Sequence, residues 1–148
     1  MNQPTGRIVV GVDGSDSSID ALRWAVRQAE LTRCDVEAVT SWQRPIGYEA
    51  DFAAEAEDWP AIAATKLEDA LAEVDAERVE VQRTVSEGHP AQVLTDASTN
   101  ADLIVVGSRG HSSFAGLLLG SVSLHVSTHA RCPVVIVRHL EAPSSARP

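Results

Sequence analysis

The feature that most constrains the fold is the alternation of short apolar runs, rich in valine and isoleucine, with longer segments that carry apolar residues at helical spacing. The short runs have the length of buried strands, and the longer segments have the period of amphipathic helices. Strands are predicted at residues 7–13, 36–42, 79–85, 103–106 and 133–137. Helices are predicted from a cap at Asp16 or Ser17 to near Thr32, from about Pro60 to Ala76, from Pro90 through Ala97, and after Gly120.

Strands that alternate with helices favour right-handed crossovers, and hence an α/β fold with an open parallel sheet covered by helices on both faces. At 148 residues the chain fits one domain, with a core over residues 7–138 and a frayed tail at 141–148. In such sheets, ligands bind beyond the carboxyl ends of the strands, where the strand order reverses.

The charge distribution is uneven along the chain. A net charge of −9 argues against nucleic-acid binding, because there is no basic surplus to neutralise phosphates. Twelve of the 21 acidic residues lie between Gly47 and Pro90, whereas residues 103–140 contain none and carry three arginines and four histidines. This acid-free stretch is either an anion-binding surface or simply a more buried part of the chain.

The sequence carries no targeting or metal-site signal. Its first residues lack the apolar core of a signal peptide, and no run approaches the ~18 apolar residues of a membrane span, so we expect a cytoplasmic protein without membrane association. Cys34 and Cys132 are far apart and lack metal-site spacing, and we expect both to be buried free thiols.

Two predicted strand ends carry residues that suit a phosphate site. The first strand ends in Gly11-Val12-Asp13-Gly14-Ser15 and the fourth in Gly107-Ser108-Arg109-Gly110, and Gly120-Ser121-Val122-Ser123 then leads into the last helix. Glycines permit close approaches and backbone conformations that residues with a Cβ avoid. A helix N-terminus and adjacent hydroxyl groups favour phosphate, so the set predicts a polyphosphate site that needs no lysine.

The glycine spacing, Gly107-x2-Gly110-x9-Gly120-Ser121, resembles the ATP-binding motif of universal stress proteins, and residues 8–15 resemble their N-terminal signature. The resemblance runs from about Arg7 to Arg138 and includes Gly88-His89-Pro90. It implies a Rossmann-like sheet of order 3-2-1-4-5, similar to adenine nucleotide alpha hydrolases. It also implies a stress-response regulator that binds ATP and hydrolyses it slowly or not at all.

The resemblance also implies roles for individual residues. Asp13 would meet the ribose or a phosphate-bound magnesium ion, and Val39 would line the adenine pocket. Gly107 and Gly110 would admit the ribose and phosphates, while Gly120 and two serines would hold the triphosphate. The nucleotide-binding residues implied are Gly11, Val12, Asp13, Gly14, Ser15, Val39, Gly107, Ser108, Arg109, Gly110, His111, Gly120, Ser121, Val122 and Ser123.

Other functions remain as alternatives. The P-loop pattern GxxxxGK[ST] is absent, and the only lysine, Lys66, falls on the predicted acidic helix. His111 is the nearest candidate base, and a lone loop histidine is a weak one, so a slow ATPase or nucleotide-dependent enzyme is the less favoured function. The third possible function is that of an interaction module, which binds either another adenine nucleotide, such as cyclic AMP, or no nucleotide. The aromatic-bearing acidic segment at 47–58 is expected either to cover the adenine or to meet a partner.

The last strand predicts a homodimer. In the implied order it lies at an edge of the sheet, yet Val134, Val135, Ile136 and Val137 form an unbroken apolar run. Exposed strand edges recruit other chains unless charges, bulges or a cover protect them. We therefore expect antiparallel pairing of this strand with its copy in a second chain, with the C-terminal tail folded over the edge as the alternative.

Overall fold

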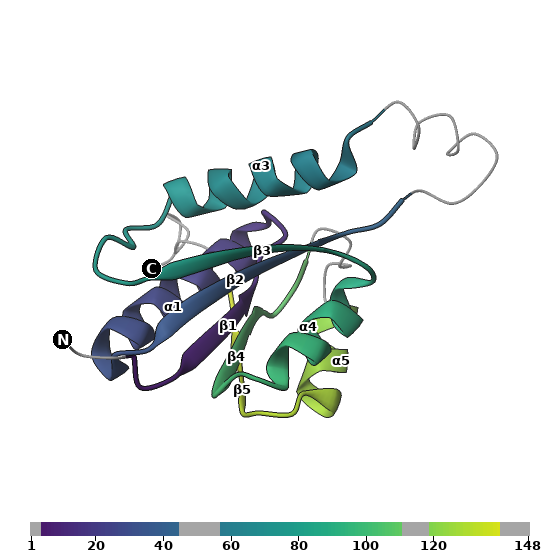
Figure 1. Cartoon of the computed structure of the whole chain (residues 1–148). Helices are drawn as coiled ribbons and strands as arrows, with labels where there is room; N and C mark the ends of the chain where they lie inside the picture. The colour runs from purple at the N-terminus through teal and green to yellow at the C-terminus, as the bar shows by residue number, and fades with distance from the viewer. Residues whose placement is uncertain (1–3, 45–56, 111–118, 140–148) are drawn as a thin grey trace, which may run out of the picture.

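The protein is described by a computed structural model over residues 4–44, 57–110 and 119–139. All pairs in its five-stranded sheet are parallel and the order is β3-β2-β1-β4-β5, which confirms the predicted fold (Figure 1). The elements are β1 (Arg7–Gly11), α1 (Asp16–Thr32), β2 (Asp35–Trp42), α3 (Trp59–Ala72), β3 (Val81–Glu87), α4 (Pro90–Ser98), β4 (Leu103–Gly107), α5 (Ser121–His129) and β5 (Val134–Val137).

Side chains alternate across the sheet and divide the core into two layers. Val10 and Val105 pack with α1 and α3 on one face, whereas Val9 and Ile104 pack with α4 and α5 on the other. Figure 1 shows the same division, with α1 and α3 on one side of the strands and α4 and α5 on the other. Burial on both faces explains why β1 and β4 are almost purely apolar.

Several predicted boundaries were wrong. The first strand, predicted over residues 7–13, ends at Gly11. The third strand begins at Val81 rather than Val79 and continues to Glu87, because it pairs residue for residue with the long β2, up to Trp42 opposite Glu87. The helix predicted to reach Ala76 ends at Ala72. A tightened last turn and an aspartate turn at Asp75, whose carboxylate accepts the Glu77 N–H at 3.3 Å, stop it there.

The start of α1 also differs from the prediction. Ser15, rather than Asp16 or Ser17, is the N-cap, and its hydroxyl accepts the Ser18 N–H at 3.3 Å. Ser17 and Ser18 are both buried, so this first turn packs inward against the carboxyl ends of the strands. The cap therefore fixes where the loop after β1 meets the helix.

The expectation of two buried thiols was wrong: Cys34 and Cys132 are free but only partly buried. Cys34 follows α1 in a turn and lies beside the Thr5 and Thr32 hydroxyls, at 3.9 and 3.3 Å. Burial, followed by the nearby Asp102 carboxylate, raises the pKa of the Cys132 thiol. Both residues lie in segments that connect helices and strands, and such segments run over the surface of a domain.

Some predictions fall outside the described residues. They concern His111, most of the acidic segment at 47–58, and the tail at 141–148 with its fold over the β5 edge. Within the described ranges, no helix is both long and apolar enough to cross a membrane.

Candidate functional site

A cleft of about 640 Å³ opens at the carboxyl ends of the central strands. It lies where β1 meets β4, the point of reversal in the strand order, as the parallel-sheet rule predicts. Its described lining is Gly11, Val12, Asp13, Ser18, Val39, Thr40, Ser41, Trp42, Gln43, Trp59, Ile62, Ala63, Lys66, Pro90, Val93, Leu94, Val106, Gly107, Arg109, Gly110, Gly120, Ser121, Val122 and Ser123.

The structure brings most of the sequence-predicted residues to this one cleft. Those that line it are Gly11, Val12, Asp13, Val39, Gly107, Arg109, Gly110, Gly120, Ser121, Val122 and Ser123. Three others do not: Gly14 and Ser15 turn the chain into α1, and Ser108 is buried. The Ser108 backbone instead anchors the loop, because its N–H donates to Val137 at 2.8 Å and its carbonyl accepts from Gly120 at 2.7 Å.

Asp13 joins the two loops that bound the cleft. Its Oδ1 accepts hydrogen bonds from the Ser15 N–H at 2.9 Å and the Ser15 hydroxyl at 2.5 Å. On the other side, a Cβ placed at Gly110 would lie 2.8 Å from Asp13 Oδ2. Gly110 therefore leaves the space that this carboxylate needs to approach the loop after β4.

The glycines at the strand ends serve packing more directly than the sequence suggested. A Cβ on Gly107 would lie 2.7 Å from the Ser17 backbone, and one on Gly11 would lie 2.8 Å from a Leu94 methyl group. Neither of these glycines nor Gly110 has the positive φ that residues with a Cβ avoid; Gly14, at φ 86°, does. The expectation of unusual backbone conformation at Gly107 and Gly110 was therefore wrong, and close approach is the reason for both.

The start of α5 presents free amide groups to the cleft. Gly120 is the N-cap, with no side-chain hydrogen bond, and the helix makes its first internal bond from the Leu124 N–H to the Gly120 carbonyl at 3.0 Å. The N–H groups of the first turn thus have no partner within the helix, which favours an anion. Ser121 is exposed at this end.

Ser123 does not fit the role predicted for it. It is buried, and its hydroxyl lies 3.0 Å from both the Ser108 and the Gly120 carbonyl oxygens. The hydroxyl thus holds the glycine loop against α5. Of the two serines predicted to bind phosphate, only Ser121 has an exposed side chain.

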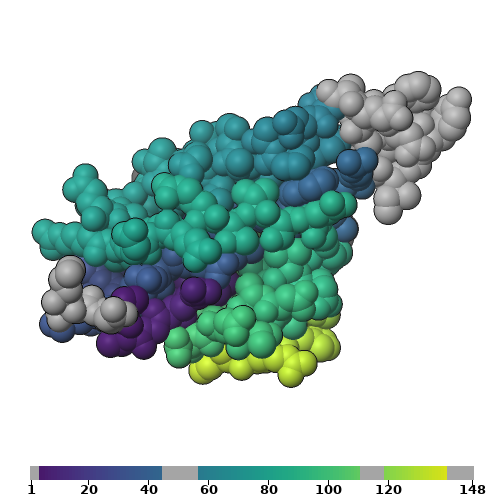
Figure 2. Space-filling model, viewed as in Figure 1, coloured from purple at the N-terminus to yellow at the C-terminus, as the bar shows by residue number. Residues whose placement is uncertain are grey.

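Sequence reasoning missed a second wall, which comes from α3 and the end of β2. On α3 it consists of Trp59, Ile62, Ala63 and Lys66, whose spacing of three, four and seven residues places them on one helix face. Figure 2 shows α3 along one border of the molecule, with α4 and α5 toward the opposite one. The helical period was visible in the sequence, but nothing local indicated that this face reaches the strand ends.

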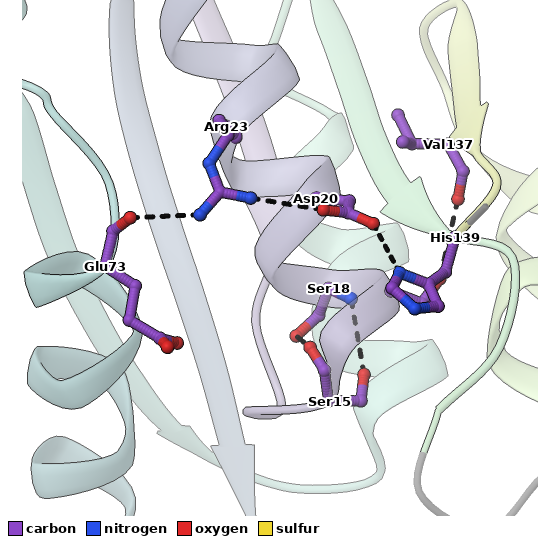
Figure 3. A network of polar contacts seen from close by, with 8 residues as sticks. Ser15, Ser18, Asp20, Arg23, Glu73, Val137 and His139 are labelled. Carbon is purple, nitrogen blue, oxygen red and sulfur yellow. Dashed lines mark hydrogen bonds and ion pairs between the residues drawn. The ribbon is translucent and has the colours of Figure 1, made fainter. Parts of the chain in front are cut away.

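A polar network holds α1 in place beside the cleft. Asp20 contacts Arg23 at 3.2 Å and His139, just beyond β5, at 2.6 Å, while Arg23 donates to the Glu73 carbonyl at 3.0 Å (Figure 3). The network ties α1 to the ends of β5 and α3. It thus supports the first turn of α1, against which Gly107 packs.

The basic residues of the acid-free stretch do not form one surface. Arg109 and Arg138 line a smaller hollow of about 350 Å³ beside the start of α1, which shares Arg109 and Gly110 with the main cleft. His125 and His129 stack on each other along α5, with ring centroids 4.1 Å apart. Ile104 and Val105, by contrast, are fully buried, so burial accounts for this part of the stretch, and anion binding by the other part stays a prediction.

Comparison with known proteins gives consistent matches. The model of the universal stress protein family matches residues 4–138. A universal stress protein of Mycobacterium tuberculosis is 34% identical over 141 residues, which cover 88% of this chain and 44% of the relative. The chain thus spans less than half the length of that protein.

Solved structures share the fold. The universal stress protein UspA from Lactobacillus plantarum matches with a TM-score of 0.73 and 24% identity over 93% of this chain and all of that one. A universal stress protein solved in complex with cAMP matches with a TM-score of 0.60 and 28% identity, over 92% of this chain and 98% of that one.

Proposed function

This chain belongs to the universal stress protein family, and from that premise we propose that it binds an adenine nucleotide in the cleft, with ATP as the principal ligand. The observation that carries the proposal is the convergence of three anion-compatible features in one cavity: the loop after β1, the glycine loop after β4 and the open N-terminus of α5. Residues more than 100 positions apart in the sequence meet there.

The cleft residues suit the parts of a nucleotide. Gly120, Ser121 and Val122 at the start of α5, together with Arg109, would bind the phosphates through N–H, hydroxyl and guanidinium donors. Gly107, Gly110 and Asp13 would border the ribose. Val39, which is 3% exposed, forms with Val12 and Leu94 an apolar floor on which a base would rest.

Magnesium, if it accompanies ATP, would be held by the phosphates and by Asp13. Mg²⁺ in nucleotide sites commonly takes one or two carboxylates, and its remaining ligands are waters and substrate phosphates. Asp13 is the one carboxylate among the described residues of the cleft, and those residues include no cluster of three metal ligands. The protein would thus supply a single oxygen ligand, whose charge would favour the magnesium-bound form of the nucleotide.

Cyclic AMP is the second candidate ligand. The relative solved with cAMP shares 28% of its sequence with this chain, and the apolar floor here does not distinguish the phosphate forms of adenosine. Competition between ATP and cAMP for the purified protein separates the two ligands.

We further propose a regulatory rather than a catalytic role, in the cytoplasm and in the response to stress. Hydrolysis needs a base within hydrogen-bond reach of the attacking water. Asp13 is the only carboxylate lining the described cleft, and it accepts two hydrogen bonds from Ser15. Phosphate release slower than about 1 per second, near the low end of enzyme turnover, is expected; faster release would favour an ATPase.

The binding proposal is tested with Ser121→Asp. This change places a negative charge at the first position of α5, where the helix dipole favours it, but also beside the expected phosphates. We expect ATP affinity measured by calorimetry to fall at least tenfold, about 1.4 kcal/mol, while the melting temperature stays the same or rises.

Ser127→Asp provides the matched control, because Ser127 is exposed on the same helix outside the cleft. Its ATP affinity should equal that of the unmodified protein. Equal affinity in Ser121→Asp would remove the α5 N-terminus from the site, and no binding of any adenine nucleotide by the unmodified protein would overturn the proposed function.

A further inference from the structure

Lys66 extends the candidate site beyond the glycine motif. It is the only lysine in the chain, and it is the last of the four α3 residues that line the cleft. Asp69 lies one helical turn away, at a spacing that permits an ion pair, yet in the described part of the chain no carboxylate pairs with the Lys66 ammonium group. The exposed ammonium group is thus not committed to stabilising the helix surface.

Lys66 decides the sign of the net charge of the described residues that line the cleft. Of the described residues that line it, Lys66 and Arg109 are cationic and Asp13 alone is anionic. The lining is therefore positive although the chain as a whole carries −9. Without Lys66 it would be neutral, inside a protein whose overall field repels anions.

Lys66 and the glycine motif lie on opposite sides of the cleft. The α3 helix packs over β2 and β3, whereas α5 belongs to the layer on the other face of the sheet (Figure 1). The ends of β2 and β4 are separated by β1, and hence by about 10 Å. The four-carbon stem of a lysine is flexible, so its ammonium group can approach a ligand that spans this distance.

We propose that Lys66 is a ligand-binding residue that contacts the phosphates of the bound nucleotide from the wall opposite the glycine motif. The inference rests on the proposed function and adds to it a second cationic contact from α3. An ammonium group is a compact, strongly hydrated charge that favours anionic partners. In an adenine nucleotide those partners are the phosphates, so the contribution of Lys66 should depend on their presence.

The test compares ATP, AMP and adenosine as ligands of the full chain and of Lys66→Gln. We expect calorimetry to show ATP affinity reduced about fivefold, AMP affinity reduced less and adenosine affinity unchanged, because adenosine has no charge for the ammonium group to bind. Lys66→Arg should restore most of the ATP affinity, and Lys66→Glu should lower it further than Lys66→Gln.

Arg27→Gln is the matched control, since it changes the net charge equally at an exposed α1 position outside the cleft. It should leave all three affinities unchanged. Equal ATP affinity in Lys66→Gln and the unmodified protein would overturn the inference while leaving the proposed function intact. An equal loss for ATP and adenosine would also overturn it, by showing that the side chain contacts the nucleoside. Failure of the unmodified protein to bind ATP, AMP, adenosine and cyclic AMP would refute the proposed function itself.

Discussion

At the scale of single residues, Gly107 shows how one missing side chain connects the fold to the site. Gly107 ends β4. The space that a Cβ of this residue would need is taken by the Ser17 backbone at the start of α1. The glycine therefore lets α1 approach the strand end closely, and that approach holds the loops after β1 and β4 on either side of one cleft. A substitution here should act through packing before it acts on a ligand.

We expect Gly107→Ala to destabilise the protein by about 1–3 kcal/mol, because the added methyl group would lie 2.7 Å from backbone atoms that cannot rotate away. For a chain of this length, each kcal/mol lowers the melting temperature by roughly 2–4 °C. Thermal unfolding measures the change. Ser121→Ala, at an exposed position of the same cleft, should change stability by less than about 0.5 kcal/mol. Equal melting temperatures for Gly107→Ala and the unmodified protein would show that α1 moves aside without cost.

At the scale of elements, α3 forms a wall of the cleft with its first two turns. Asp58 is its N-cap and accepts the Ala61 N–H at 3.2 Å, and Pro60 occupies the first turn, where a missing N–H is tolerated. The inner half of the helix is fixed by buried Leu67 and Ala70, but the end that bears Trp59 and Ile62 depends more on its cap. The order of this wall should therefore affect ligand affinity.

Asp58→Ala should lower stability by about 1 kcal/mol, through the loss of the capping hydrogen bond, and should also weaken nucleotide binding as the first turn loosens. Asp58→Asn preserves the cap and is the control. Thermal unfolding and calorimetry with ATP measure the two effects. If Asp58→Ala loses stability but binds ATP unchanged, the first turn of α3 does not contribute to the site.

At the scale of the whole molecule, the two edges of the sheet differ. The β3 edge carries exposed Gln82 and Arg83, whereas β5 is four partly buried apolar residues. Their side chains are already used, because Val135 and Val137 pack with the α1 layer while Val134 and Ile136 pack with the α4 and α5 layer. Lysine substitutions on β5 would therefore disturb the core as well as the edge. A second chain could therefore pair with the backbone N–H and C=O groups of this edge strand rather than with its side chains.

The direction of the backbone groups gives a cleaner test of the predicted dimer. The carbonyls of Pro133 and Val137 accept hydrogen bonds from Ile104 in β4 and from Ser108 directly after it, at 3.0 and 2.8 Å. Because backbone groups alternate in direction along a strand, the Val134 and Ile136 N–H groups point away from the sheet. Val134→Pro removes one outward donor at the first residue of an edge strand, where proline is tolerated. We expect light scattering to show a folded monomer for this variant.

Val134→Ala is the matched control, since it shortens the side chain but retains the N–H group. It should remain a dimer. A Val134→Pro protein that has the same dimeric mass as the control would remove the β5 backbone from the interface, and a monomeric unmodified protein would remove the dimer altogether.

The amino-acid sequence by itself predicted the order of the elements and the end of the sheet at which the candidate site lies. Local patterns sufficed for the elements, as in the apolar runs of β1 and β4 and the Gly-His-Pro start of α4. In each, the backbone preferences and the burial of the residues themselves specify the element. The resemblance carried by the glycine motif and the N-terminal signature then implied the sheet order, and eleven of the fifteen residues that it implied line the described cleft.

Only the tertiary structure decided which other residues line the cleft and what several of the expected residues do. Gly107 makes room for Ser17, the Ser123 hydroxyl is already bonded to two carbonyls, and Lys66 lies in the cleft. Each of these facts depends on contacts between segments far apart in the chain, and a local pattern contains no information about which distant atoms will fill a given space. A glycine in the sequence indicates only that a Cβ is missing; the fold decides whether a helix, a carboxylate or a ligand takes its place.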